Sequence, residues 1–140
     1  MSTNGKATVR FVVDDLFIGV TPAGRALVLD TNSQRSSAPS PVELLLVALG
    51  SCTATDVASI LKKKRQHVTS YTVEVTGKRR DEYPRSYSSM NVHHIVTGRN
   101  ISRQSMSQAV NLSDEKYCSV AATLRPAAEI VSSFEIIEIL

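Results

Sequence analysis

The feature that most constrains the fold of this 140-residue chain is a long segment with a helical pattern, which begins at Pro41 and ends near Gln66. From Val42 to Leu49 almost every residue is apolar. A helix that is hydrophobic on all sides is a buried helix. Because a domain of this size has little material with which to cover every face of one helix, we expect part of it to pack against a second subunit.

Both ends of this segment carry ordinary helix signals. Ser40 suits the N-cap position and Pro41 suits the first helical position. The basic run Lys62–Arg65 comes at the other end, where cations complement the helix dipole. No aromatic residues are interleaved with this run, which argues against nucleic-acid binding. The apolar run Val42–Leu49 is too short to cross a bilayer, so we expect no membrane contact.

Shorter elements flank this helix on both sides. Two further helices are expected, one at Ser102–Val110 and one that starts with Ser113 as its cap and is limited by Pro126. Strands are expected at Ala7–Val13, Leu16–Val20, Ala26–Leu29, Val68–Lys78, Ser86–Thr97 and Ile130–Ile139. The first three strands form an antiparallel meander, and the next two form a long hairpin. The order βββ-α-ββ-αα-β predicts a single α+β domain over residues 1–140, with residues 1–5 disordered.

Composition is that of a soluble globular protein. Hydrophobic residues make up 42% of the chain and charged residues 21%, and the net charge is only +3. The segment Met1–Lys6 lacks the apolar core of a signal peptide. These observations predict a cytoplasmic protein, in a compartment where reducing systems keep thiols free.

The two cysteines, Cys52 and Cys118, each lie in a segment with a helical pattern. Free cysteine is among the most buried residue types, so plain core packing is one interpretation. Gly50 beside Cys52 allows another part of the chain to approach closely. Cys118 falls near the N-terminal end of its expected helix, with Lys116 two residues away, and both features favour a thiolate. A cysteine pair in a reducing compartment is more often catalytic than structural.

Charged residues decide whether Cys52 is reactive. Asp56 lies four residues further along, on the same helical face, and its carboxylate opposes a thiolate unless a cation lies close to both. The candidate cations are in the hairpin turn: Arg79, Arg80 and Arg85. Glu43 lies about 180° around an ideal helix from Cys52. It is either an acid that favours the helix N-terminus or a site residue brought close by a bend at Gly50.

Metal and cofactor sites fit the sequence poorly. His93 and His94 are adjacent in an expected strand and therefore point to opposite faces. His67 lies at a helix end, and no pair of histidines has ligand spacing with a cysteine. The chain has no glycine-rich phosphate loop and no Gly-x-Ser-x-Gly elbow. We expect no metal and no cofactor.

Two motifs in combination resemble a known superfamily. Ser40–Val57 around the first cysteine and Glu115–Val120 around the second are similar to the osmotically inducible protein C and organic hydroperoxide resistance (OsmC/Ohr) superfamily. The turn with Arg79–Arg80 and Pro84–Arg85, and the segment Ala109–Ser113, resemble its YhfA-like branch. The resemblance covers nearly the whole chain.

The resemblance implies an OsmC-like α+β fold, with antiparallel sheets around the long buried helix, in an intertwined homodimer with two active sites at the subunit interface. It also implies a thiol peroxidase that acts on small organic hydroperoxides. Cys52 would attack the peroxide and Cys118 would resolve the resulting sulfenic acid to a disulfide. An external dithiol, in this family often a lipoylated protein, would supply the reducing equivalents.

The chain departs from the best-understood members of this superfamily at two places. Those members have a glutamate directly after the proline of the helix, where this chain has Val42 and places Glu43 one residue later. They also have an arginine after the first strand, where this chain has Asp14 and Asp15. A second hypothesis is therefore a non-peroxidatic dimeric protein that binds a small thiol, electrophile or acyl ligand. A third is a structural dimer in which both cysteines are core residues.

Overall fold

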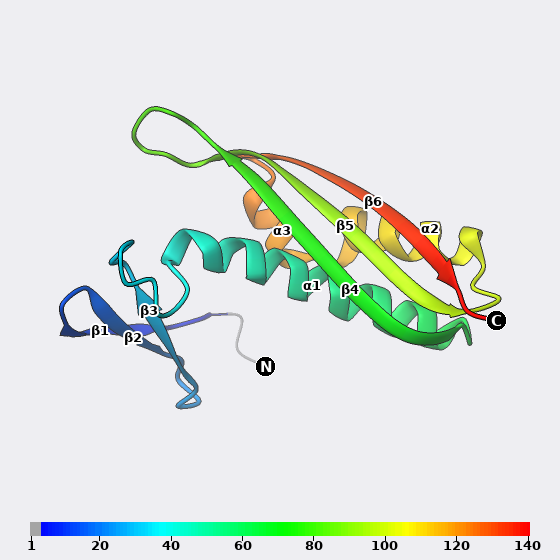
Figure 1. Ribbon diagram of the computed structural model, residues 1–140, viewed down its shortest axis with the longest axis horizontal. Helices are drawn as coiled ribbons and strands as arrows, with labels where there is room; N and C mark the ends of the chain where they lie inside the picture. Colours follow the sequence, from blue (N-terminus) through cyan, green and yellow to red (C-terminus); the bar gives the residue numbers. More distant parts are fainter. Residues whose placement is uncertain (1–3) are drawn as a thin grey trace. The chain divides into compact units, whose positions relative to one another are not determined.

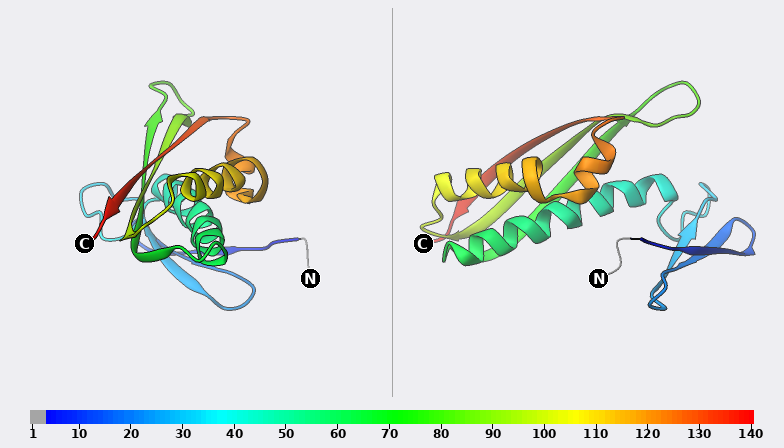
Figure 2. Two further views of the ribbon diagram at one scale, coloured as in Figure 1. Left: turned by 90° about the vertical axis from the view of Figure 1, so that its right-hand side faces the viewer. Right: turned by 180° about the vertical axis from the view of Figure 1, so that it is seen from behind.

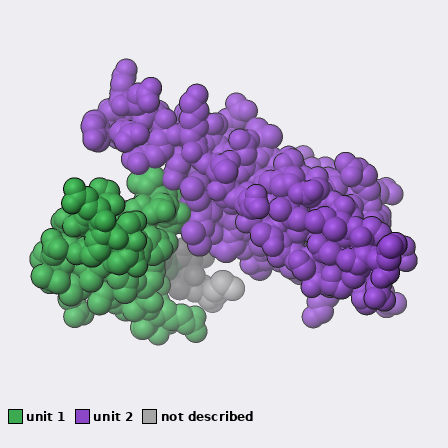
Figure 3. Space-filling model, viewed as in Figure 1, with its two compact units in different colours: residues 1–45 green, residues 46–140 purple. Residues whose placement is uncertain are grey.

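The structure, a computed structural model, describes residues 4–140 and consists of two compact units. One unit extends to Leu45 and the other runs from Leu46 to Leu140 (Figure 3). The single domain over residues 1–140 stays a prediction. The expected disorder of residues 1–5 lies partly outside the described residues, and within them Asn4 and Gly5 are exposed and belong to no helix or strand.

The first unit contains the predicted meander of three short strands. Strands β1 (Thr8–Val13), β2 (Leu16–Val20) and β3 (Ala26–Asp30) pair in sequence order, and both pairs are antiparallel (Figure 1). Asp14 and Asp15 make the first turn with positive φ angles of 49° and 64°. Aspartate tolerates this left-handed conformation, and two such residues in a row match the twist of a tight hairpin.

The polar loop after β3 is tied to the meander by a buried carboxylate. Asp30 is 3% exposed and accepts hydrogen bonds from Arg35 Nε at 2.8 Å and from the Ser37 hydroxyl at 2.6 Å. The Arg35 guanidinium, followed by Ser37, holds the pKa of Asp30 far below its usual range. Arg35 Nη1 also lies 2.9 Å from Asp14 Oδ2, so one arginine joins the loop both to the turn between β1 and β2 and to Asp30 at the end of β3.

The second unit is built on a three-stranded sheet. Strands β4 (His67–Arg79) and β5 (Tyr87–Arg99) form the predicted long antiparallel hairpin. Strand β6 (Glu129–Glu138) pairs with β5 in parallel, so the expectation of antiparallel pairing throughout is wrong for this sheet. The chain returns from the end of β5 through helices before it enters β6, and a helical crossover of this kind brings two neighbouring strands into the same direction.

The described residues, 4–140, also contain three α-helices and one π-helical turn. Helix α1 (Pro41–Lys63) begins in the first unit and continues through the second. Helix α2 (Arg103–Leu112), the π-helical turn η1 (Ser113–Tyr117) and helix α3 (Ser119–Leu124) form the crossover between β5 and β6. Figure 2 shows α1 and α2 side by side on the same face of the sheet. The α+β class and the predicted order of elements are confirmed, with η1 as an addition.

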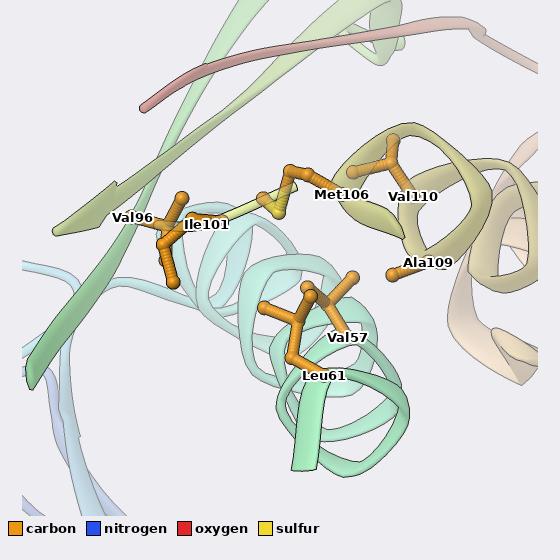
Figure 4. Close-up of a cluster of buried hydrophobic side chains, with 7 residues drawn as sticks. All are labelled: Val57, Leu61, Val96, Ile101, Met106, Ala109 and Val110. Carbon is orange, nitrogen blue, oxygen red and sulfur yellow. The ribbon is translucent and has the colours of Figure 1, made fainter. Parts of the chain in front are cut away.

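The core of the second unit lies between these two helices and the sheet. It is a cluster of buried side chains contributed by α1, by β5, by the turn that follows β5 and by α2 (Figure 4). Its members are Val57, Leu61, Val96, Ile101, Met106, Ala109 and Val110. The burial of Met106, Ala109 and Val110 shows that α2 contributes an apolar face to this core, which the sequence analysis did not assign to it.

Helix α1 buries one face in the single chain. At Gly50 an added Cβ would come within 3.0 Å of Val75 Cγ2, so the glycine allows α1 to approach β4 closely. Leu49, Thr53 and other buried residues continue this face, whereas Val47 is 59% exposed. Helix α1 therefore leaves apolar surface exposed in the single chain, and the expectation that part of it packs against a second subunit stays a prediction.

Helix α1 as a whole is longer than the apolar run on which the membrane argument was based. By length and composition its 23 residues are apolar enough to cross a membrane. The core helix of a soluble protein satisfies the same criterion, and one face of α1 is packed against the sheet and α2. The length argument alone therefore does not exclude a membrane span, and the packing of α1 inside the unit argues against one.

A glycine at the far end of the sheet provides a test of this packing. An added Cβ at Gly98 would collide with the backbone carbonyl oxygen of His67 and with the Ile101 side chain. Because backbone atoms yield less than side chains, we expect Gly98→Ala to lower the free energy of unfolding by about 1–3 kcal/mol in a urea titration. Gly19→Ala is the control, since its Cβ meets only Leu29 Cδ1 at 3.5 Å. Equal urea midpoints for the two variants would contradict this packing.

Candidate functional site

The two cysteines lie together in the second unit. Cys52 is half-buried on α1, and Cys118 is buried at the break between η1 and α3. Both are free thiols, and the side chain of Cys52 is near enough to contribute to the raised pKa of the Cys118 thiol. The fold thus brings together two residues that are far apart in the sequence. Their roles as attacking and resolving thiols stay predictions.

The surroundings of Cys118 differ from those expected. Cys118 is not in the second turn of a helix, because it is the extended N-cap residue of α3 and its Sγ accepts the Ala121 N–H at 3.4 Å. The pKa of this thiol is raised to about 11, mainly by burial and to a smaller extent by the neighbouring Cys52 and Asp56, against the opposing effect of the Ala121 N–H. Lys116 Nζ lies 5.3 Å from the ring centroid of Tyr117. Burial therefore outweighs the helix end, and Cys118 is protonated at pH 7.

A chain of hydrogen bonds lies next to the thiols. Thr53 Oγ1 and Ser113 Oγ are 2.8 Å apart, and Ser113 Oγ donates to Asp56 Oδ2 at 2.8 Å. Thr53 and Ser113 are 2% and 0% exposed. The sequence identified Asp56 but not its two partners, because Ser113 has the features of a helix cap and Thr53 those of an ordinary core position.

Asp56 is held by a neutral partner. Among residues 4–140, none of the salt bridges involves Asp56. Its hydrogen-bond partner is the neutral hydroxyl of Ser113. The carboxylate is therefore held in place by hydrogen bonding and contributes to the raised pKa of the Cys118 thiol.

The three hairpin arginines bond to the backbone of their own loop. Arg79 Nε donates to the carbonyl of Arg85 at 2.8 Å, Arg80 Nη1 to that of Pro84 at 3.2 Å, and Arg85 Nε to that of Arg80 at 3.2 Å. These bonds account for the arginines as stabilisers of an exposed turn. A role beside Cys52 stays a prediction.

Glu43 forms a capping box at the start of α1. The Ser40 N–H donates to Glu43 Oε1 at 3.0 Å, and the Glu43 N–H donates to Ser40 Oγ at 3.2 Å. Hydrogen bonding of the Ser40 backbone N–H, followed by that of the Ser40 side chain, to the carboxylate lowers the pKa of Glu43. The helix-terminus interpretation of Glu43 explains its contacts, and its participation in the thiol site stays a prediction.

A pocket of about 460 Å³ lies beside Asp56. It is lined by Thr55, Asp56, Ser59, Ile60, Lys63, Lys64, Leu112 and Tyr117. Cys52 precedes Asp56 by one helical turn, so the pocket continues the helical face that carries the attacking candidate. Its apolar and cationic walls suit a small organic molecule. The sequence placed the lysines at a helix end and did not reveal that they share a pocket with Asp56.

Two histidines lie on opposite faces of β5, as predicted. His93 is on the open face, where Nδ1 lies 2.7 Å from Ser133 Oγ and Nε2 lies 3.1 Å from Glu135 Oε1. His94 is fully buried, and its Nδ1 lies 2.7 Å from the Tyr71 hydroxyl. Burial, followed by the charge of His93, lowers the pKa of His94 to about 4. Within residues 4–140 no three His, Cys, Asp or Glu side chains are placed to hold a metal ion.

The chain is similar to known proteins in sequence and in fold. Residues 33–133 match the model of a family described as OsmC-like protein. The chain is 44% identical over 132 residues to protein YhfA of Escherichia coli strain K12, which covers 94% of this chain and 98% of that protein. A crystal structure of a hypothetical protein from Aquifex aeolicus VF5 is 31% identical, with a TM-score of 0.88 and coverage of 99% and 100%.

A more distant structure shares the fold. It is that of an organic hydroperoxide resistance protein OsmC from Legionella pneumophila, also described as a predicted redox protein, with a TM-score of 0.70. It is 14% identical to this chain and covers 94% of it, with 96% of its own length aligned. At this identity the likeness concerns the fold alone.

The buried histidine predicts a pH dependence of stability. Between pH 6.5, the ordinary pKa of the side chain, and pH 4 the unfolded state binds a proton that folded His94 does not. Stability is therefore complete above pH 6.5 and falls as the pH decreases through this window, by about 1–2 kcal/mol at pH 5. Urea unfolding at pH 7 and pH 5 measures the loss. His94→Gln should show a smaller loss, and equal losses in both proteins would refute the assignment to His94.

Proposed function

The chain belongs to the OsmC-like family, and we propose that it is a cytoplasmic thiol peroxidase that reduces small organic hydroperoxides through Cys52 and Cys118. The observation that carries this proposal is that the fold brings a half-buried thiol and a buried thiol close enough for Cys52 to affect the pKa of Cys118. A pair of this kind, with one accessible and one protected member, suits sequential attack and resolution.

Cys52 is the attacking thiol in this mechanism. It is the more accessible of the two, and the pocket that contains Asp56 begins one helical turn further along α1. The Cys52 sulfur, as thiolate, attacks the terminal oxygen of the hydroperoxide and the O–O bond breaks. The sulfur is oxidised to a sulfenic acid, and the organic part leaves as an alcohol after it takes up a proton.

Cys118 is the resolving thiol. Its sulfur displaces the hydroxyl group of the Cys52 sulfenic acid, so that the S–O bond breaks and the disulfide forms. The proton of the Cys118 thiol leaves with the hydroxyl as water. Because burial raises its pKa to about 11, Cys118 stays protonated until this step and does not compete for the peroxide.

An external dithiol completes the cycle. It reduces the Cys52–Cys118 disulfide to two thiols by thiol–disulfide exchange and is itself oxidised to a disulfide. A lipoylated protein is the reductant that we propose. The chemistry requires no metal, haem or flavin.

We place this activity in a homodimer. The exposed apolar face of α1 borders a groove of about 370 Å³ between α1 and β4, whose walls include Val47, Ala54 and Val73. The Val47 side chain is 59% exposed. An exposed apolar surface on a helix is typical of a subunit interface. A second copy of the chain is the occupant that the apolar pattern of α1 favours.

A second candidate function is a non-peroxidatic binding protein. The observation that favours it is Asp56, whose carboxylate lies near the thiols and bonds to a neutral hydroxyl in place of a cation. In this case the pocket beside Asp56 would hold a small thiol, electrophile or acyl ligand, and Cys52 would not be oxidised by peroxide.

Titration with one equivalent of cumene hydroperoxide separates the two functions. For a peroxidase we expect loss of both free thiols and a Cys52–Cys118 disulfide in the peptide map by mass spectrometry. Cys52→Ser should abolish the reaction, because the attacking sulfur is gone. Cys118→Ser should retain it and leave a sulfenic acid that dimedone traps. Two intact thiols in the wild type after prolonged exposure would exclude the peroxidase.

Sedimentation velocity tests the dimer. Val47→Asp places a charge on the exposed apolar face of α1, and we expect it to shift the dimer toward monomer, because burial of an unpaired charge is costly. Thr72→Asp is the control. Thr72 is exposed on β4, and its side chain points to the face of the strand opposite to that of Tyr71 and Val73. A wild type that sediments as a monomer, or a Val47→Asp variant that remains dimeric, would contradict this interface.

A further inference from the structure

Ser113 is a fully buried residue that contacts both thiol-bearing segments. Its hydroxyl lies 2.8 Å from Thr53 Oγ1 and 2.8 Å from Asp56 Oδ2, both on α1. Its carbonyl oxygen accepts the backbone N–H of Cys118 at 2.9 Å. One residue therefore bonds with its side chain to the helix of Cys52 and with its backbone to Cys118 itself.

The hydrogen bonds of the Ser113 side chain have a definite direction. A serine hydroxyl has one proton, and here it goes to the Asp56 carboxylate, which accepts only. The Thr53 hydroxyl must then donate to Ser113 Oγ. The result is a directed chain from Thr53 through Ser113 to Asp56, in which each hydroxyl proton has an acceptor. Such a buried network holds its members in one arrangement as long as all of them are present.

The position of these groups relative to Cys52 is set by the helix. Thr53 follows Cys52 directly and Asp56 lies one turn further along. The two hydrogen bonds between the Ser113 side chain and these residues therefore attach η1 to the turn of α1 that begins at Cys52. The backbone bond from the Cys118 N–H to the Ser113 carbonyl spans five residues, in the pattern of a π-helix. It ends the helical path at Cys118, which takes an extended conformation with ψ of 100°.

We propose that Ser113 is a positioning residue, which holds Cys118 against Cys52 so that a disulfide forms between them. Its part in catalysis rests on the proposed peroxidase function. In the resolving step the Cys118 sulfur must approach the Cys52 sulfur opposite the departing hydroxyl, and small misplacements slow such a step. Without the Ser113 hydroxyl, η1 loses its side-chain anchor on α1 and Cys118 samples more positions.

The segment also offers a matched control. Ser132 Oγ of β6 donates to Asp114 Oδ1 at 3.0 Å, so this hydroxyl ties η1 to the sheet without contacting α1. Ser132→Ala removes the hydrogen bond that ties η1 to β6, whereas Ser113→Ala removes the two side-chain hydrogen bonds that tie η1 to α1. A general loosening of η1 would affect both variants alike, whereas a positioning role of the α1 anchor affects only Ser113→Ala.

The experiment measures the two chemical steps separately in the full-length protein. Reduced protein reacts with one equivalent of cumene hydroperoxide, and samples quenched over time are assayed for disulfide and for the dimedone adduct of Cys52. In Ser113→Ala we expect thiol attack at the wild-type rate and disulfide formation about tenfold slower, with a larger dimedone adduct, because both side-chain hydrogen bonds that anchor η1 on α1 are lost. Ser132→Ala should resemble the wild type.

Two Thr53 variants cover the case in which Ser113→Ala does not fold. Thr53→Val keeps the shape of the side chain and removes the hydroxyl that donates to Ser113, so disulfide formation should slow in the same direction. Thr53→Ser keeps the hydroxyl and should restore the rate. Wild-type rates of disulfide formation in Ser113→Ala and Thr53→Val, or equal slowing in Ser132→Ala, would overturn the proposal.

Oxidation by diamide separates this proposal from the peroxidase function. Diamide is reduced to its hydrazine as it oxidises two thiols to a disulfide, and it requires no attack on a peroxide. If the wild type forms the Cys52–Cys118 disulfide with diamide but not with the hydroperoxide, the peroxidase function fails. Slower disulfide formation with diamide in Ser113→Ala than in Ser132→Ala still supports the positioning role, and equal rates refute it.

Discussion

The burial of one face of α1 against the sheet and α2 is the constraint on which the second unit depends. Gly50 allows the helix to approach Val75 of β4, and Val57 and Leu61 continue the same face into the core cluster. Packing in this orientation fixes the rotation of α1 about its axis. Cys52 and Asp56 therefore point toward η1 and α3, and the exposed face that includes Val47 is left for a partner. The packing that forms the core therefore also determines which side chains of α1 face the thiol site.

Burial has two effects at the thiol site. Burial keeps Cys118 protonated, which protects it from oxidants. Burial also makes the hydroxyls of Thr53 and Ser113 depend on one another and on Asp56, because a buried polar group without a partner is costly. The same low-polarity environment thus separates the proposed roles of the two thiols and stiffens the turn that carries the second one.

Much of the fold was predictable from local patterns. Alternating residues marked the meander and the hairpin of β4 and β5, and the apolar run with its helix signals marked α1. The parallel pairing of β6 was not predictable, because the direction of a strand depends on the path of the crossover and leaves no trace in its own alternation. The break at Cys118 was missed for a similar reason, since the Ser113 and Asp114–Glu115 sequence is also typical of a helix start.

The sequence by itself determined the family, the class of fold and the pair of candidate thiols, because these depend on residue types at defined spacings. Only the tertiary structure decided which groups surround the thiols. In the folded protein, within residues 4–140, Asp56 accepts a hydrogen bond from Ser113 and is not paired with an arginine, and Cys118 is the buried N-cap residue of α3. These outcomes depend on contacts between segments far apart in the chain. They also depend on burial, because the pKa of a buried group is set by its loss of water and by its hydrogen bonds, and both exist only in the folded protein.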